Sequence, residues 1–390
     1  MSDVIPPEVV ENILSRLPVT PLLRFRSVSK PWRALIDDPH FIESHLNQSI
    51  HNNTHLGIIN RDCYFYSIDF DSLDNATKLD HPLKSPNFGT ELKGSCNGLL
   101  LLSNLEEDNI IWNPSTRKYW YLPVTGIDFP EHVFCGCDII NFGLGYDHAS
   151  DDYKVMRVVQ FDTFDSEVKP YKLVNGVLVS GALHWVVRRD PESKANLVCG
   201  FDLGSEEYRL IPLPEFSDED FHMSVNELGG CLCVVCNYHF LYTDIWVMKV
   251  YGVKESWTKL FSVAQPRDID SFEYVRPLAY SKSGEKVLME KDSKSLIWFD
   301  LENMTIEEVC IRGMPKNVEA TIYLGSLVQL SGGGGSEGKK QQLQEQKKKK
   351  KNLKKSYSAL PACNCLLLKL VFSYSALPAG HSDCLSSIFL

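Results

Sequence analysis

This 390-residue sequence contains no long hydrophobic run. A membrane-spanning helix needs roughly 18–20 consecutive apolar residues, and no stretch approaches that length. At the N-terminus, Asp3 and Pro6-Pro7 interrupt the apolar stretch that a secretory signal requires. We therefore expect neither membrane insertion nor secretion.

The motifs of common catalytic sites are also missing. The sequence has no Gly-x-Ser-x-Gly, no His-Glu-x-x-His, no phosphate-binding loop and no cysteine signature of ubiquitin-transferring enzymes. Four of its 11 histidines (His40, His45, His51 and His55) lie in or near an N-terminal helical region. His184 lies on an expected inner strand, where a hydrogen-bonded core residue is the simpler interpretation. We expect no catalytic residues and no cofactor.

Cysteine is present, but it lacks the spacing of a metal site or a disulfide framework. The 12 cysteines are scattered, and Cys231-x-Cys233-x-x-Cys236 is the only tight cluster of three. No second pair follows at zinc spacing, and the segment also fits a buried apolar strand. We expect reduced thiols in an intracellular compartment and no metal.

Positive charge is scarce outside the C-terminal end. Residues 336–390 hold ten lysines against three acidic residues, which leaves a net charge of −17 on residues 1–335. Phosphate contacts require lysine and arginine, so the body of the chain is not expected to bind nucleic acid.

The N-terminal 48 residues carry the strongest local signal. Val10, Ile13, Leu14 and Leu17 form an apolar stripe at helical spacing. Pro6-Pro7 suits the first helical turn, and Pro18 ends the helix. Thr20, Ser29 and Asp38 are expected to cap three more short helices, whose apolar positions are Leu22, Phe25, Val28, Trp32, Leu35, Ile36, Phe41, Ile42 and Leu46.

So small a bundle cannot bury this many apolar side chains by itself. Two interpretations follow from the residues alone. The helices either cap the domain that follows, or they form a docking module for a partner protein.

From about residue 50 the pattern changes to short apolar or alternating runs separated by turn residues, which indicates an all-β region. Gly98, Gly181 and Gly230 each precede an apolar run. Asn113, Asp202 and Asp300 each follow an aromatic residue and begin a turn, and they are 89 and 98 residues apart. Two units of roughly 45–50 residues fit each interval, the length of a kelch-type propeller blade. A β-sandwich with similar turns is the alternative.

The helical region resembles an F-box. The matching pattern is Ile5-Pro6-x-Glu8, then Ile13-Leu14-x-Arg16-Leu17-Pro18, then Leu22-x-Arg24-Phe25-Arg26-x-Val28-x-Lys30-x-Trp32-x-x-Leu35-Ile36. Pro31 departs from the family pattern but can occupy a helix start. The resemblance implies that the module binds a Skp-family adaptor and, through it, a cullin. The residues assigned to adaptor binding are Ile5, Pro6, Glu8, Ile13, Leu14, Leu17, Pro18, Leu22, Arg24, Phe25, Val28, Trp32, Leu35 and Ile36.

Residues 95–330 resemble the F-box-associated, kelch-like region of plant F-box proteins. The matches are Ser95-Cys96-Asn97-Gly98-Leu99, Trp112-Asn113-Pro114-Ser115-Thr116, Gly143-Leu144-Gly145-Tyr146-Asp147 and Asp151-Asp152-Tyr153-Lys154-Val155. Within this group the sequence is similar to receptors that restrain plant immunity by lowering NLR immune-receptor levels, and more distantly to S-locus F-box proteins. One departure is residues 160–180, where about one hairpin is missing.

The resulting expectation is a multidomain α plus all-β chain. Residues 1–48 form the F-box, 49–330 a kelch-like β-propeller with one shortened blade, and 331–390 a disordered, basic, low-complexity tail. The tail contains a lysine run, Lys347–Lys351, that suits either a nuclear localisation signal or a solvated segment.

We expect the chain to be a non-catalytic substrate receptor of an SCF ubiquitin ligase in the cytoplasm and nucleus. Its protein target, an NLR immune receptor by resemblance, is expected to contact blade-connecting loops such as 125–137, 162–169 and 215–222. The alternative is a stand-alone binding propeller, or a metal oxidase, whose N-terminal helices are only a packing cap.

Overall fold

The structure is a computed structural model. It describes residues 6–52, 56–61, 64–70, 72–84, 89–104, 109–122, 139–160, 175–188, 196–216, 221–238, 241–264, 272–313, 319–329, 369–373 and 385–389. The chain divides into two compact units. One contains Met1–Trp120, Ser293–Leu296 and Glu308–Leu330, and the other contains Tyr121–Asp292, Ile297–Glu307 and Ser331–Leu390.

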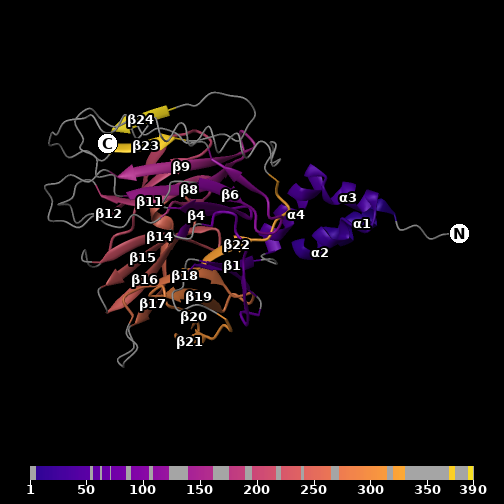
Figure 1. The fold of residues 1–390 in the computed structure, drawn as a ribbon. Coiled ribbons are helices and arrows are strands. Elements are labelled where there is room, and N and C mark those ends of the chain that lie inside the picture. Colours follow the sequence, from indigo (N-terminus) through magenta and orange to yellow (C-terminus); the bar gives the residue numbers. More distant parts are fainter. Residues whose placement is uncertain are drawn as a thin grey trace. The chain divides into compact units, whose positions relative to one another are not determined.

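Four helices form the N-terminal module (Figure 1), as the periodicity predicts. They are α1 (Pro7–Leu14), α2 (Val19–Phe25), α3 (Lys30–Ile36) and α4 (Pro39–Asn52). The Ser29 hydroxyl accepts a hydrogen bond from the Trp32 amide at 3.2 Å, which confirms the predicted cap of α3. The predicted cap at Thr20 is wrong, because α2 begins one residue before it with Pro18 at the N-cap position.

The core of the helical module is closed by a residue far away in sequence. Leu14, Leu22, Ile36 and Phe41 are at most 1% exposed and pack with Val19. Leu327, from the end of the β region, belongs to the same apolar cluster and is 3% exposed. The module is therefore packed against a segment of its own compact unit, and only part of its apolar surface is left for a partner.

The β region consists of successive antiparallel sheets, as expected for a β-propeller. Five of the described sheets have four strands, in the orders β22-β1-β2-β3, β4-β5-β6-β7, β10-β11-β12-β13, β14-β15-β16-β17 and β18-β19-β20-β21. A sixth contains only β8 and β9 among the described residues. The bounds are β1 Leu56–Arg61, β2 Phe65–Asp69, β3 Ala76–Lys78, β4 Thr90–Cys96, β5 Leu99–Asn104, β6 Asn109–Trp112, β7 Tyr119–Tyr121, β8 Ile139–Asp147, β9 Asp152–Gln160, β10 Val177–Val179, β11 Ala182–Arg188, β12 Asn196–Asp202, β13 Tyr208–Ile211, β14 His222–Leu228, β15 Cys231–Tyr238, β16 Tyr242–Met248, β17 Trp257–Ala264, β18 Val275–Tyr280, β19 Lys286–Lys291, β20 Ser295–Asp300, β21 Ile306–Val309 and β22 Thr321–Leu324.

The glycines of the sequence repeat occupy tight hairpin turns. Asn97-Gly98, Ser180-Gly181 and Gly229-Gly230 each connect the first two of four strands, and both residues of each pair have positive φ. Two-residue hairpins prefer this conformation because its twist matches that of the strands. At Gly98 a Cβ atom would also lie 2.3 Å from the Leu324 carbonyl oxygen, so only glycine fits.

The polar residue of the repeat forms a second recurring turn. The side-chain oxygen of Asn113 accepts hydrogen bonds from the amides of residues 115 and 116 at 2.9 and 3.2 Å. Asp202 and Asp300 accept equivalent pairs of amide hydrogen bonds. In each turn the side-chain oxygen takes the place of a backbone carbonyl as acceptor for the amides two and three residues later. Asn and Asp side chains are short enough to reach these amides, which is why one of them recurs at this position.

The two ends of the β region meet in one sheet. Strand β22 pairs antiparallel with β1, with Leu56 opposite Leu324 and Ile59 opposite Thr321. The first sheet thus contains one strand from the end of the region and three from its beginning. This pairing holds the two ends of the region together.

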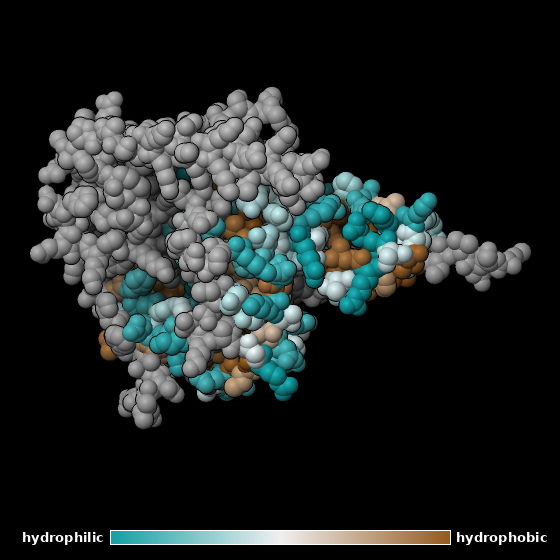
Figure 2. Space-filling model, in the orientation of Figure 1, coloured by the Kyte–Doolittle hydropathy of each residue, from teal (hydrophilic) through white to brown (hydrophobic). Residues whose placement is uncertain are grey.

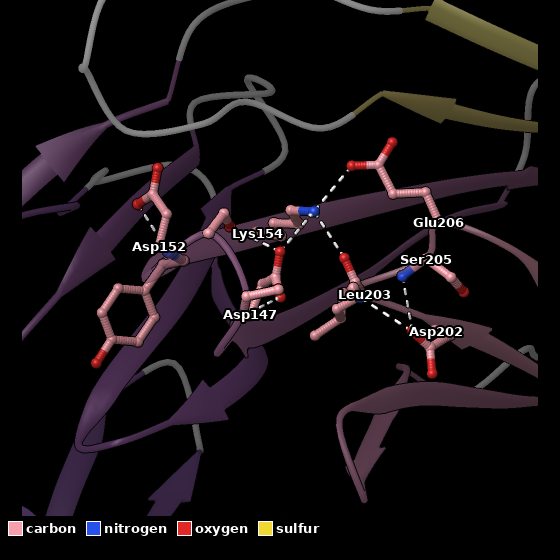
Figure 3. A network of polar contacts seen from close by, with 11 residues as sticks. Asp147, Asp152, Lys154, Asp202, Leu203, Ser205 and Glu206 are labelled. Atoms are coloured by element: carbon pink, nitrogen blue, oxygen red, sulfur yellow. Dashed lines mark hydrogen bonds and ion pairs between the residues drawn. The ribbon is translucent and has the colours of Figure 1, made fainter.

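A buried lysine ties the two-stranded sheet to its neighbour in the same unit (Figure 3). The Lys154 ammonium group donates to the Leu203 carbonyl oxygen at 2.6 Å and pairs with Asp147 at 3.0 Å and with Glu206 at 2.8 Å. Burial alone would raise the pKa of Asp147, but hydrogen bonds from Ser150, Lys154 and the Ala149 amide outweigh it and lower the pKa. The network joins the β8–β9 turn to the β12–β13 turn.

Replacing Lys154 with Met should destabilise this unit by about 3–5 kcal/mol, because the substitution leaves the buried Asp147 carboxylate without its cation. Thermal unfolding in neutral buffer measures the loss. Lys286→Met is the matched control, since its partner Glu307 and Lys286 itself are solvent-accessible, and it should leave the unfolding temperature unchanged. Equal effects of the two substitutions would contradict the role assigned to Lys154.

Candidate adaptor-binding site

The first helix presents an apolar face to solvent. Val9 is 45% exposed and Ile13 is 52% exposed, and their spacing of four residues places them on one side of α1. Pro6 and Glu8, at the start of the helix, are exposed as well. Figure 2 shows brown, apolar surface on the helical module. This is a surface that a partner protein could bury.

A second exposed apolar residue, Val28, lies in the turn between α2 and α3. It is 61% exposed. The turn is held by two polar contacts, in which the Ser27 hydroxyl donates to the Arg24 carbonyl oxygen at 2.6 Å and Arg26 pairs with Asp37 at 2.7 Å. Val28 is therefore exposed on a turn that is held in one conformation by side-chain contacts.

The other residues assigned to adaptor binding fall into three groups. Leu14, Leu22 and Ile36 are buried in the module's core and are not accessible to a partner in the free chain. Leu17, Phe25, Trp32 and Leu35 are half-buried, and Phe25 packs edge-on against Trp32 at 5.6 Å between ring centroids. Pro18 and Arg24 are exposed, and Ile5 lies outside the described residues.

A buried histidine fixes the turn at Leu17-Pro18. The Nε2 atom of His45 donates to the Leu17 carbonyl oxygen at 2.9 Å. Burial lowers the pKa of His45, and this hydrogen bond offsets the shift only in part. His45 is thus neutral at neutral pH and serves as a donor in the module's core.

The segment that carries Leu327 is held by Asn113. The Asn113 side-chain amide donates to the carbonyl oxygens of Ser326 and Val328 at 3.1 and 2.9 Å. The same side chain shapes its own turn through its oxygen. Asn113 therefore links a sheet turn to the residue that closes the core of the helical module.

Sequence reasoning did not single out Val9, which is exposed on α1, or Asn113 and Leu327 as residues that support the helical module. The spacing of four between Val9 and Ile13 was a signal that could have identified Val9. Asn113 was recognised only as a repeat residue, and its second role depends on a segment more than 200 residues away. No local pattern distinguishes Leu327 from other apolar residues near the end of the β region.

The cysteine cluster is part of a strand, as the alternative interpretation expects. Cys233 packs into one apolar cluster and Cys236 into another, because they lie on opposite faces of β15. Burial raises the pKa of both thiols. Among the residues that the structure describes, no group of three potential metal ligands comes together.

His184 is a hydrogen-bonded core residue, in agreement with the prediction. Its Nδ1 atom donates to the Val177 carbonyl oxygen at 3.1 Å, and its Nε2 atom accepts from the Tyr251 hydroxyl at 2.7 Å. Burial lowers the pKa of His184 to about 4, so the ring is neutral.

Most of the loops assigned to target binding lie outside the described residues. Residues 125–137 and 162–169 lie outside the described residues, as do 217–220 of the third loop.

No helix in the described ranges is long and apolar enough to cross a membrane.

Comparison with known families supports both parts of the architecture. Residues 3–44 match the F-box domain, and residues 56–330 match the F-box associated beta propeller domain. These matches coincide with the helical module and with the region of repeated sheets.

Three curated relatives from Arabidopsis thaliana align along most of their length. F-box protein CPR1 is 40% identical over 373 residues, covering 83% of this chain and 88% of the relative. F-box protein At4g22390 is 33% identical, with 83% and 90% covered. F-box/kelch-repeat protein At3g23880 is 26% identical, with 83% and 95% covered. Together with the two domain matches, these relatives show that the chain belongs to the F-box proteins that carry an F-box-associated β-propeller domain.

Proposed function

We propose that this chain is the substrate-recognition subunit of an SCF-type ubiquitin ligase. The helical module binds a Skp-family adaptor, which connects it to a cullin, and the β-propeller binds a protein target. The observation that carries the proposal is the apolar surface of an F-box module whose core is already complete: Val9, Ile13 and Val28 remain exposed although Leu327 closes the core.

The alternative, in which the helices only cap the β region, explains less of the structure. A packing cap buries its apolar residues against the domain that it covers. Here Leu327 fills that role in the described residues of the unit, while four large apolar side chains of the module, Val9, Ile13, Val28 and Ile50, stay 45–61% exposed. Val9 and Ile13 lie on one side of α1, and an exposed apolar face of this kind is typical of a protein–protein interface.

In this function the chain forms and breaks no bonds. It holds a target near a ubiquitin carrier. The rate of ubiquitin transfer increases because the local concentration of a target lysine near the carrier rises. The contacts that fix the helical module to Leu327 limit the orientations that the module can adopt within its unit.

We infer that the target is an immune receptor of the NLR class and that the chain negatively regulates plant defence. The sequence resemblance to receptors that restrain plant immunity supports this target. We place the chain in both cytoplasm and nucleus because of the lysine run at Lys347–Lys351. A fluorescent fusion of the full chain excluded from nuclei would contradict that placement.

Proximity labelling in plant cells, with and without proteasome inhibition, tests the proposal. Target proteins should accumulate near the intact chain when the proteasome is inhibited, and their levels should rise when Ile13→Asp replaces the wild-type chain. Unchanged labelling and unchanged levels would contradict the receptor function. NLR levels that do not change when the gene is deleted would contradict the immune-receptor target alone.

A further inference from the structure

One sheet of the β region has fewer described strands than the others. The sheet of β8 and β9 has two described strands, whereas the other sheets of the region have four. The chain itself is short at this point. Only 16 residues separate the end of β9 from the start of β10, compared with 33 between β11 and β14 and 34 between β5 and β8. Each of the longer intervals contains two strands, and the short one has about half their length.

The C-terminal tail contains a β-hairpin that belongs to none of the four-stranded sheets. Strand β23 (Lys369–Ser373) pairs antiparallel with β24 (Leu385–Phe389), with Lys369 opposite Phe389. Strand β23 lies beside β9 in the same compact unit, and β9 lies between β8 and β23 (Figure 1). The hairpin is therefore placed where the missing strand pair would lie.

The two elements are complementary. The outer strand of a sheet is a template for another strand, and an isolated two-stranded hairpin is only marginally stable in water. The sequence Lys369-Leu370-Val371-Phe372-Ser373 is rich in strand-forming residues. The 38 residues 331–368, at up to about 3.3 Å each, can span the distance from the end of the β region to this sheet.

We propose that the C-terminal hairpin β23–β24 docks on the outer edge of β9 and supplies the third and fourth strands of the shortened sheet. The occupant is the chain's own tail, because this tail is the segment seated there. The tail is then a structural part of the propeller and not a solvated extension. This inference does not depend on the ligase function.

A cleavage experiment on the full chain tests the proposal. A specific protease site replaces Gly332–Gly335, and the cleaved protein is analysed by size-exclusion chromatography in neutral buffer. The fragment 336–390 should elute with the β region in near-equimolar amount. Val371→Pro removes a strand amide and should reduce retention at least about tenfold. The matched control, Leu343→Pro, changes the tail outside both strands and should leave retention intact.

The other outcomes are equally informative. Separate elution of the wild-type fragment after cleavage would overturn the proposal, and so would equal retention of the Val371→Pro fragment. Elution of the uncleaved chain at twice its mass, with the dimer lost on Val371→Pro, would replace the intramolecular assignment by strand exchange with a second copy. Hydrogen exchange of residues 152–160 provides an independent readout, since docking should slow it in wild type relative to Val371→Pro.

Discussion

Replacing Ile13 with Asp should lower the affinity for a purified Skp-family adaptor at least about 100-fold, which corresponds to roughly 2.7 kcal/mol. Ile13 is 52% exposed in the last turn of α1, on the same side of the helix as Val9. A partner that buries this face would have to bury an unpaired carboxylate, which carries a large desolvation cost. Because the side chain projects into solvent in the free chain, the fold of the module should be retained. Isothermal titration with the full chain measures the effect.

A matched isoleucine on α4 provides the control. Ile50 is 49% exposed, so Ile50→Asp introduces the same charge at similar exposure outside the assigned face. It should change adaptor affinity less than about threefold, as expected for a residue outside the interface. If Ile50→Asp weakened binding as much as Ile13→Asp did, the assigned face would be wrong. If neither substitution weakened binding, the exposed patch would have another role.

Replacing Leu327 with Ala should loosen the helical module by about 2–5 kcal/mol, the usual cost of deleting a buried leucine side chain. Leu327 is 3% exposed and packs with Leu14, Leu22 and Phe41. Truncation leaves a cavity in the module's core although the substituted residue belongs to the β region. Hydrogen-exchange mass spectrometry should show faster exchange in α1, α2 and α3, because the local opening free energy falls.

Leu241→Ala is the control for this substitution. Leu241 is 68% exposed, so the same change in side-chain volume should alter stability by no more than about 0.5 kcal/mol. Unchanged exchange of α1–α3 in Leu327→Ala would show that the helical module is self-sufficient. That result would contradict the packing role that we assign to Leu327.

The parts of the fold that depend on local chemistry were predictable from sequence. The stripe of Ile13, Leu14 and Leu17 and the cap at Ser29 identified helices because helical periodicity and capping act over a few residues. The recurring turns were likewise detected, since Gly98 and Asn113 each satisfy a local backbone requirement. The residues alone left two folds open for the β region, a β-propeller and a β-sandwich. The resemblance to a known family favoured the propeller.

Long-range contacts were not predictable in the same way. Whether Leu14 faces a partner or the module's own core depends on Leu327, more than 300 residues later. The split of the predicted adaptor-binding set into exposed and buried residues follows from how the four helices pack with one another and with Leu327. The missing hairpin near residues 160–180 was visible as a length deficit, but the position of the C-terminal hairpin beside β9 was not.

The contact between the helical module and Leu327 also has a consequence for biosynthesis. The four helices are translated first, yet the last member of their apolar cluster is added about 280 residues later, which at typical synthesis rates is on the order of half a minute. A chain interrupted before residue 327 lacks this leucine, and one interrupted before residue 321 also lacks the strand that pairs with β1. Incomplete chains thus keep the proposed adaptor-binding face of α1 on a module with an open core, and we expect them to compete poorly with finished chains for the proposed adaptor.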